Sequence, residues 1–338
     1  MKVEMSLMNH SLKDIGDEAR RAEALGYDGV TTGETVADPF FKLVLAAEHT
    51  REVTLGTSVL IVFPRSPMVV AYQAWDLQGF SEGRLHLGIG TQVGAHIRRR
   101  FSSAWGSPGP RLREYIAALR AIWDCWTNGS RLNFRGDFYQ FNLMTPYFTP
   151  GGIEHPRIPI YISAINPYNC RLAGELCDGI RMHGFNTPKY AREVIIPNLV
   201  EGAGKAGRTL KDIDIVGVGF VITGPDEEAV QRAIVRVKKQ IAFYASTPAY
   251  RPVMDIHGWG EEHLELHRLS REGKWDEMGE LITDEMVDEF ATLGTYDEIA
   301  GKIKAKWGGV STRMGFAMPV RGPEDEERLK SILAELRS

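Results

Sequence analysis

The chain has 338 residues, of which 43% are hydrophobic and 25% are charged, and these fractions indicate an ordinary globular protein. The formal net charge is −4, which argues against a partner such as nucleic acid or an anionic membrane. The three cysteines form no Cys-x-x-Cys pair, so neither a zinc site nor a disulfide framework is expected. Because no charged leader or long apolar run follows Met1, the sequence predicts a cytoplasmic protein without a membrane span.

Predicted strands and helices alternate along the first third of the chain. Val53 to Val62 is a β-branched run that ends just before Pro64, as expected of a strand buried on both faces. Pro67 to Phe80 has apolar residues at helical spacing, and Leu85 to Ile89 alternates as a strand does. This strand–helix–strand unit of about 40 residues implies a parallel sheet. The predicted strands are 2–7, 27–32, 53–62 and 85–89. The predicted helices are one that ends at residue 26 and three at 38–50, 67–80 and 110–127.

The rest of the chain continues this alternation, but two segments interrupt it. Residues 128–157 contain the turn dipeptides Asn128-Gly129 and Gly136-Asp137 beside short aromatic stretches, and these predict a hairpin. Residues 245–282 form a second irregular segment with several prolines and glycines. The predicted elements are strands at 156–163, 178–183, 213–223 and 313–320, and helices at 170–176, 190–206, 227–244, 284–306 and 324–336. Eight strands alternating with helices predict an α/β fold, a (β/α)8 TIM barrel, as one domain over 1–338 with two insertions.

In such a barrel the functional site lies at the carboxyl ends of the strands. These ends carry the carboxylate of Glu34, the histidines His96 and His183, and small or amide side chains. They include no nucleophile–base pair and no acidic cluster that would hold a metal ion. Such a set suits a planar cofactor that brings its own reactivity. His263 and His267 are spaced as metal ligands on a helix can be, but their acidic neighbours favour a solvated helix face.

Six sequence motifs occur in an order that resembles one known family. They are G-Y-D-G-V, L-G-T-S-V-L, L-G-I-G-T, I-P-I-Y-I-S-A, R-L-A-G-E-L-C-D-G-I and V-D-E-F-A-T-L-G-T-Y-D-E-I-A. The set resembles the luciferase-like monooxygenase superfamily of flavin and deazaflavin oxidoreductases, from Met1 to about Val320. Gln92-Val93, His96-Ile97, the helix Arg111 to Trp123 and L-M-T-P-Y-F resemble most the subgroup that uses coenzyme F420.

The resemblance implies a (β/α)8 barrel with insertions and a non-prolyl cis peptide at Ser58–Val59 in the third strand, where a bulge backs the cofactor ring. It also implies that Thr91 and Gln92 bind the pyrimidine edge or ribityl chain, and that a segment after the fifth strand directs N–H groups at the tail phosphate. This segment, S-A-I-N-P, lacks the glycine that many relatives carry. The implied cofactor-binding residues are Ser58, Val59, Thr91, Gln92, Ser163, Ala164, Ile165 and Asn166.

Three residues are candidates for acid–base work on the substrate. Glu34 stands where relatives have an acidic residue, often followed by histidine, but here Thr35 follows. A carboxylate over an apolar ring pocket would have a raised pKa and act as an acid; the alternative is a structural hydrogen bond to a nearby loop. His183 and His96 are the candidates to replace the absent imidazole, and for each a structural role is the alternative. The aromatic residues Tyr244, Tyr250 and Trp259 line a substrate pocket or hold their own loop in place.

The sequence therefore predicts an oxidoreductase that uses coenzyme F420 to transfer a hydride between the deazaflavin C5 and a small organic substrate, such as an alcohol, aldehyde or enone. One alternative is a monooxygenase that uses FMN and molecular oxygen, because a reduced flavin activates oxygen and a 5-deaza ring does so poorly. A second alternative is a non-catalytic barrel that carries the cofactor. The resemblance also implies a homodimer.

Overall fold

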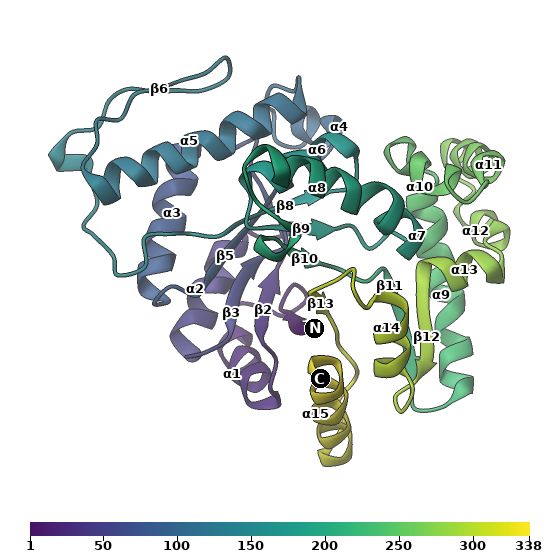
Figure 1. The fold of residues 1–338 in the computed structure, drawn as a ribbon. Helices are drawn as coiled ribbons and strands as arrows, with labels where there is room; N and C mark the ends of the chain where they lie inside the picture. The colour runs from purple at the N-terminus through teal and green to yellow at the C-terminus, as the bar shows by residue number, and fades with distance from the viewer.

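Eight parallel strands close into a barrel in the computed structural model, which describes residues 1–338 (Figure 1). Each strand pairs with its neighbours, and the circle closes where β1 pairs with β13 and where β3 pairs with β5. The barrel strands are β1 (Lys2–Ser6), β2 (Gly29–Thr32), β3 (Thr54–Thr57), β5 (Leu85–Gly90), β8 (Ile160–Ala164), β9 (Gly179–Met182), β10 (Asp214–Val216) and β13 (Arg313–Gly315). The predicted (β/α)8 barrel is confirmed.

Helices surround the barrel, and several begin at a polar residue that the sequence places directly before a proline. Asp38, Ser66 and Asn166 each accept a hydrogen bond from a backbone N–H of the helix that follows, and a proline comes next in each case. The main outer helices are α1 (Ile15–Leu25), α2 (Pro39–His49), α3 (Pro67–Phe80), α5 (Pro108–Asn128), α6 (Pro167–Leu176), α8 (Ile196–Lys205), α9 (Glu227–Ala245), α14 (Ile299–Trp307) and α15 (Pro323–Arg337).

The third predicted strand, 53–62, is interrupted. Its first part is β3 and its second part is β4 (Leu60–Ile61), and both pair with β5. Ser58 and Val59 lie between them, and the peptide bond that joins these two residues is cis. The backbone therefore leaves the regular ladder at the carboxyl end of β3, next to the mouth of the barrel.

Two predictions in the second half of the chain are wrong in detail. The single strand predicted at 213–223 is two strands, β10 and β11 (Phe220–Gly224), because Gly217 and Gly219 turn the chain at φ values of 123° and 68°. The single helix predicted at 284–306 is α13 (Asp284–Phe290), β12 (Ala291–Thr295) and α14. β12 pairs with β11 in a small parallel sheet outside the barrel, so pairing overrides the local helical pattern.

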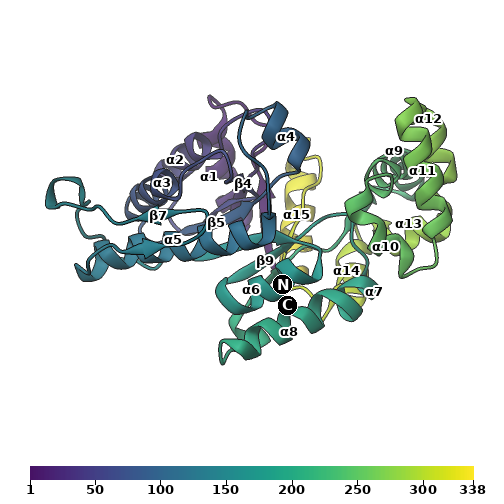
Figure 2. The ribbon, with the colours of Figure 1, turned by 90° about the horizontal axis from the view of Figure 1, so that it is seen from above.

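The two insertions project from opposite sides of the barrel (Figures 1 and 2). The first contains the hairpin of β6 (Phe134–Arg135) and β7 (Gln140–Phe141), as the turn dipeptides predict. The second is helical and packs on α9, with short helices α10 (Arg251–Asp255), α11 (Gly260–Glu272) and α12 (Trp275–Met278). Minor elements are α4 (Gly94–Arg99), α7 (Pro188–Tyr190), η1 (Pro146–Phe148), η2 (Ala191–Ile195), η3 (Leu210–Asp212), η4 (Pro248–Tyr250) and η5 (Gly279–Leu281).

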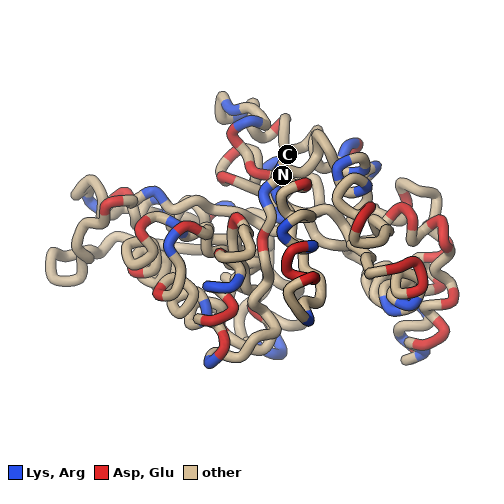
Figure 3. Tube along the Cα trace, turned by 90° about the horizontal axis from the view of Figure 1, so that it is seen from below, with Lys and Arg blue, Asp and Glu red and all other residues tan.

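Figure 3 marks the positions of the charged residues on the chain trace, and positions of both signs are interspersed along it. None of the helices has the length and apolar character needed to cross a membrane.

A cluster of charged side chains lies inside the barrel, toward the amino ends of the strands. Arg181 donates two hydrogen bonds to Glu4, at 2.9 and 3.2 Å, and Arg313 contacts Glu4 at 3.4 Å. Arg313 also donates to Asp214 at 2.9 Å. Glu4 and both arginines are almost completely buried, so the two positive charges are balanced by carboxylates and not by water.

His86 stands next to this cluster, stacked on Tyr161 with ring centroids 5.2 Å apart. Burial lowers the pKa of His86 to about 4, and the nearby Arg313 acts in the same direction. In the unfolded chain a histidine has a pKa of about 6.5. Between these two values the unfolded chain binds a proton that the folded chain does not bind, so stability is lost as the pH falls from about 6.5 to about 4.

We therefore expect His86→Phe to reduce the acid sensitivity of the fold. Phenylalanine keeps a ring on Tyr161 and removes the titrating group. The free energy of unfolding, measured in urea at about pH 7 and about pH 5, should fall less in the variant than in the wild type. Equal losses in the two proteins would contradict this prediction.

Candidate active site

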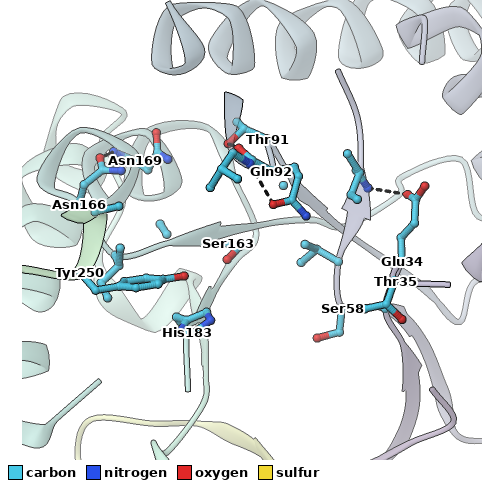
Figure 4. A pocket seen from close by; sticks show the side chains of 18 of the residues that line it. Glu34, Thr35, Ser58, Thr91, Gln92, Ser163, Asn166, Asn169, His183 and Tyr250 are labelled. Atoms are coloured by element: carbon cyan, nitrogen blue, oxygen red, sulfur yellow. Dashed lines mark hydrogen bonds between the residues drawn. The ribbon is translucent and has the colours of Figure 1, made fainter. Parts of the chain in front are cut away.

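A cleft of about 1130 Å³, including its open mouth, lies at the carboxyl ends of the barrel strands (Figure 4). It is lined by 20 residues, and none of them is lysine or arginine. All eight residues that the family resemblance implies for cofactor binding line this cleft, although they come from three different strand ends. They are Ser58, Val59, Thr91, Gln92, Ser163, Ala164, Ile165 and Asn166.

One wall of the cleft is the break between β3 and β4. Two glycines let the backbone of this break approach its neighbours. A Cβ atom on Gly33 would lie 2.7 Å from the Ser58 carbonyl oxygen, and one on Gly90 would lie 2.8 Å from a methyl group of Val59. The wall is therefore made of backbone and small side chains.

Thr91 and Gln92 follow β5 and form the floor beside this wall. Gln92 has a φ of 57°, a left-handed conformation that is uncommon for a residue with a side chain. The Thr91 hydroxyl donates to the Gln92 carbonyl at 3.0 Å, and the Gln92 side-chain oxygen accepts from the Val93 N–H at 3.0 Å. These two bonds hold the turn and leave the Gln92 amide NH2 group available to a ligand.

The third part of the lining is the start of α6. Asn166 caps this helix by accepting from the Asn169 N–H at 2.9 Å, and both asparagines line the cleft. The Tyr190 hydroxyl donates to the Ile165 carbonyl at 3.0 Å and fixes the chain just before the cap. Polar side chains and the positive end of the helix dipole therefore meet at this end of the cleft.

Glu34 lines the cleft, but its carboxylate is not free. Arg65 donates to both carboxylate oxygens at 2.9 Å, and the Ile61 N–H donates at 2.8 Å. Figure 4 shows the Glu34 side chain turned toward this strand segment and away from His183 and Tyr250. Arg65 also binds Asp38 at 2.8 Å. These contacts are structural hydrogen bonds of the kind given above as the alternative, and the acid role of Glu34 stays a prediction.

We expect Glu34→Gln to lower the free energy of unfolding and to change turnover little. The amide cannot form the ion pair with Arg65, which should reduce the free energy of unfolding by about 1–3 kcal/mol. Asp38→Asn is the matched control, because it removes the other carboxylate partner of Arg65. Urea unfolding and turnover of each variant would be measured together. A Glu34→Gln protein as stable as the wild type but without turnover would restore the acid role.

The structure separates the two candidate histidines. His183 lines the cleft directly after β9, and its Nδ1 accepts a hydrogen bond from the Phe185 N–H at 3.0 Å. Burial lowers the pKa of His183 to about 4, so the ring is neutral near pH 7. His96 is exposed on α4 and is not part of the cleft; it lies with Arg99 and Arg100 in a separate surface depression. An acid–base role for His96 thus has no support in the geometry.

Several cleft residues escaped the sequence analysis, and some of them come from segments without a predicted strand end. Tyr250 belongs to the second insertion, where its role was left open between pocket and loop packing, and it lies in the cleft. The missed residues that line the cleft include Met8, Asn169, Thr247 and Ala249. Asn169 could have been predicted, because it lies in the first turn of the helix that follows the fifth strand.

His263 and His267 do not form the solvated face that we expected. His263 is 3% exposed and its Nδ1 lies 2.6 Å from the Ala245 carbonyl oxygen. His267 Nδ1 lies 2.9 Å from the Ser246 carbonyl oxygen. Both rings therefore bind the carbonyl groups at the end of α9, which are left without partners inside that helix.

The barrel and its cleft define a class of protein, a (β/α)8 enzyme whose site suits a planar cofactor, and comparisons with known proteins agree. A sequence model described as luciferase-like monooxygenase matches residues 2–311. An uncharacterized protein of Mycobacterium tuberculosis is 42% identical over 337 residues, which cover 100% of this chain and 98% of the relative. The 5,10-methylenetetrahydromethanopterin reductase of Archaeoglobus fulgidus is 27% identical over 323 residues, covering 93% and 92%.

Solved structures show the same fold. The coenzyme F420 dependent tetrahydromethanopterin reductase from Methanopyrus kandleri has a TM-score of 0.78 at 21% identity, covering 99% of this chain and 98% of that chain. The oxygenating constituent of 3,6-diketocamphane monooxygenase from Pseudomonas putida, in complex with FMN, has a TM-score of 0.66 at 15% identity, covering 99% and 98%. This chain belongs to the luciferase-like monooxygenase family, and it is an oxidoreductase.

Proposed function

We propose that the protein is a coenzyme F420-dependent oxidoreductase that transfers a hydride between the deazaflavin C5 and a small alcohol, aldehyde or enone. The observation that carries this proposal is that one cleft gathers all eight residues implied for deazaflavin binding. Relatives named as reductases of tetrahydromethanopterin compounds, one of them F420 dependent, give it further support.

The cleft has features that fit such a cofactor. Gly33 and Gly90 leave room for a planar ring against Ser58 and Val59. The Gln92 amide, the Ser163 hydroxyl and the Asn166 amide are polar groups of the lining that suit the hydrogen-bonding edges of a deazaflavin and its ribityl chain. The start of α6 would receive the tail phosphate through backbone N–H groups and the two asparagines.

A bound deazaflavin would supply the hydride acceptor or donor at C5. In alcohol oxidation the hydride of the carbinol carbon would go to that position, and the proton of the hydroxyl group would go to a water molecule in the open cleft. The protein orients the substrate carbon toward the ring and keeps the ring against the wall of Ser58 and Val59. Of the three candidate acid–base residues, His183 and Glu34 line the cleft, and Glu34 is paired with Arg65.

A titration with two cofactors tests this function. Purified protein would be titrated with oxidised coenzyme F420 and, separately, with FMN, while fluorescence quenching is followed. We expect micromolar or tighter binding of F420 and binding of FMN at least about tenfold weaker. Preference for FMN would support the monooxygenase alternative, for which the FMN-bound structural neighbour is the precedent, and oxygen consumption would be the next assay. Binding of neither cofactor would refute the proposal.

The carrier alternative makes a different prediction. A barrel that only carries the cofactor would bind F420 but leave its redox state unchanged with every alcohol, aldehyde or enone offered. Loss of the F420 absorbance in the presence of an alcohol, which reports reduction of the ring, would rule this alternative out.

We also propose that the protein is a homodimer, as the family resemblance implies. Exposed apolar side chains on the helices after β2 and β3, including Phe41, Val69 and Phe80, offer an apolar surface for such contact. Sedimentation equilibrium should then give twice the chain mass of 37.8 kDa. A monomer at micromolar concentration would contradict it.

A further inference from the structure

One wall of the cleft presents two aromatic side chains whose polar ends face the ligand space (Figure 4). His183 follows β9, and Tyr250 ends η4, the turn after α9. Their rings are stacked, with centroids 4.7 Å apart and an interplanar angle of 26°. Tyr244 packs edge-on against both rings, at 4.6 Å from His183 and 5.9 Å from Tyr250. The pair is therefore held by a small aromatic cluster and not by a single contact.

Both polar ends are uncharged hydrogen-bond donors. The His183 Nδ1 is occupied as an acceptor for the Phe185 N–H, so the hydrogen-bond pattern places the ring proton on Nε2. Burial lowers the pKa of His183 to about 4 and raises the pKa of Tyr250 to about 12. Near neutral pH the imidazole and the phenol therefore each offer one N–H or O–H, and neither carries a charge.

The charged residues that line the cleft determine which ligands His183 and Tyr250 can bind. The lining contains no lysine or arginine, and the carboxylate of Glu34 is already paired with Arg65. A carboxylate on the substrate would lose its hydration beside these two rings without gaining a cation, whereas the tail phosphate of the cofactor is assigned to the N–H groups at the start of α6. An uncharged oxygen atom would instead accept hydrogen bonds from two donors that it finds already in place.

The turn that carries Tyr250 is fixed from outside the barrel. His263 and His267 of α11 bind the carbonyl oxygens of Ala245 and Ser246, the residues that lead into this turn. Inside the turn, the Tyr250 N–H donates to the Thr247 carbonyl at 2.9 Å. The second insertion thus positions Tyr250 in the cleft, which gives this part of the chain a role in the site.

We propose that Tyr250 and His183 together bind the oxygen of an uncharged carbonyl or hydroxyl group, and that this pair makes the enzyme select neutral substrates over anionic ones. The inference deepens the proposed oxidoreductase function and rests on it for the identity of the cofactor. The inference adds a substrate-binding role for Tyr250 and limits His183 to donating a hydrogen bond to the substrate.

The test compares Tyr250→Phe and His183→Phe with the wild type, because both changes keep an aromatic ring in the stack and remove one donor. Tyr147→Phe is the matched control, since that tyrosine is 89% exposed and lies outside the cleft. Calorimetry would measure the binding of cyclohexanone, cyclohexanol and cyclohexanecarboxylate to each protein, with and without F420. A separate titration would measure the affinity of each protein for F420.

We expect the wild type to bind the neutral probes at least tenfold more tightly than the carboxylate, and each cleft variant to lose about tenfold in affinity for them. Affinity for F420 should stay within about twofold in both variants, and Tyr147→Phe should match the wild type throughout. Tighter binding of the carboxylate, no binding of either neutral probe, or unchanged affinities in both variants would each overturn the proposal. Failure of the wild type to bind F420 would instead refute the proposed function, while the probe affinities of the protein alone would still decide this inference.

Discussion

Glu4→Gln is expected to lower the free energy of unfolding by about 3–5 kcal/mol, although the change removes only one charge and almost no volume. Glu4 is 3% exposed and accepts hydrogen bonds from both Arg181 and Arg313 inside the barrel. Without that charge, Arg313 keeps the carboxylate of Asp214, but Arg181 loses its carboxylate partner and remains as a buried, uncompensated positive charge. Urea unfolding followed by circular dichroism would measure the loss.

Glu201→Gln is the control for this prediction, because Glu201 forms an ion pair with Lys205 on the surface of α8. The side chains of this pair are 51% and 55% exposed, so the change should cost less than about 1 kcal/mol. If the two variants lost the same stability, burial would not be the cause, and the barrel cluster would be no more important than a surface ion pair.

Gly33→Ala should weaken cofactor binding about ten- to a hundredfold while the protein still folds. The added Cβ would lie 2.7 Å from the carbonyl oxygen of Ser58, so the wall that we assign to the cofactor ring must move. Overpacking of this kind costs about 1–3 kcal/mol, and each 1.4 kcal/mol corresponds to about a tenfold change in affinity. The fluorescence titration with F420 would measure the effect.

The matched control is Gly204→Ala on α8, where a Cβ would have no neighbour within 4 Å. This variant should bind the cofactor as the wild type does, and its helix should be slightly more stable. Wild-type affinity in Gly33→Ala would mean that the ring does not lie against the break in the third strand, and the cofactor site would then need to be placed elsewhere in the cleft.

Much of the fold was accessible from local patterns. The helix at 67–80 has the predicted bounds, since a serine cap, a first-turn proline and apolar residues at helical spacing all mark the same segment. The strand predicted at 85–89 was equally clear, and it is β5 in the structure. β12 was missed because five residues between two helices carry too little periodicity, and only their pairing with β11 makes them a strand.

The candidate site was predicted unevenly, for a physical reason. Residues at strand ends were found because a parallel barrel brings all carboxyl ends to one face, and this rule needs no knowledge of side-chain positions. The state of Glu34 was not predicted, because Arg65 lies 31 positions away and only the folded chain places its guanidinium on that carboxylate. His96 was a candidate by sequence position, but α4 directs it to the surface.

The sequence by itself determined the barrel and the edge at which the site lies, because alternating strands and helices of this length have few ways to close. The family followed from the resemblance of the six ordered motifs. Only the tertiary structure decided the chemistry of the cleft. Glu34 forms an ion pair with Arg65, Tyr250 enters the cleft from an insertion, and the Nδ1 of His183 is occupied by the Phe185 N–H. These properties depend on contacts between residues far apart in the chain, and such contacts leave no periodic trace in the sequence.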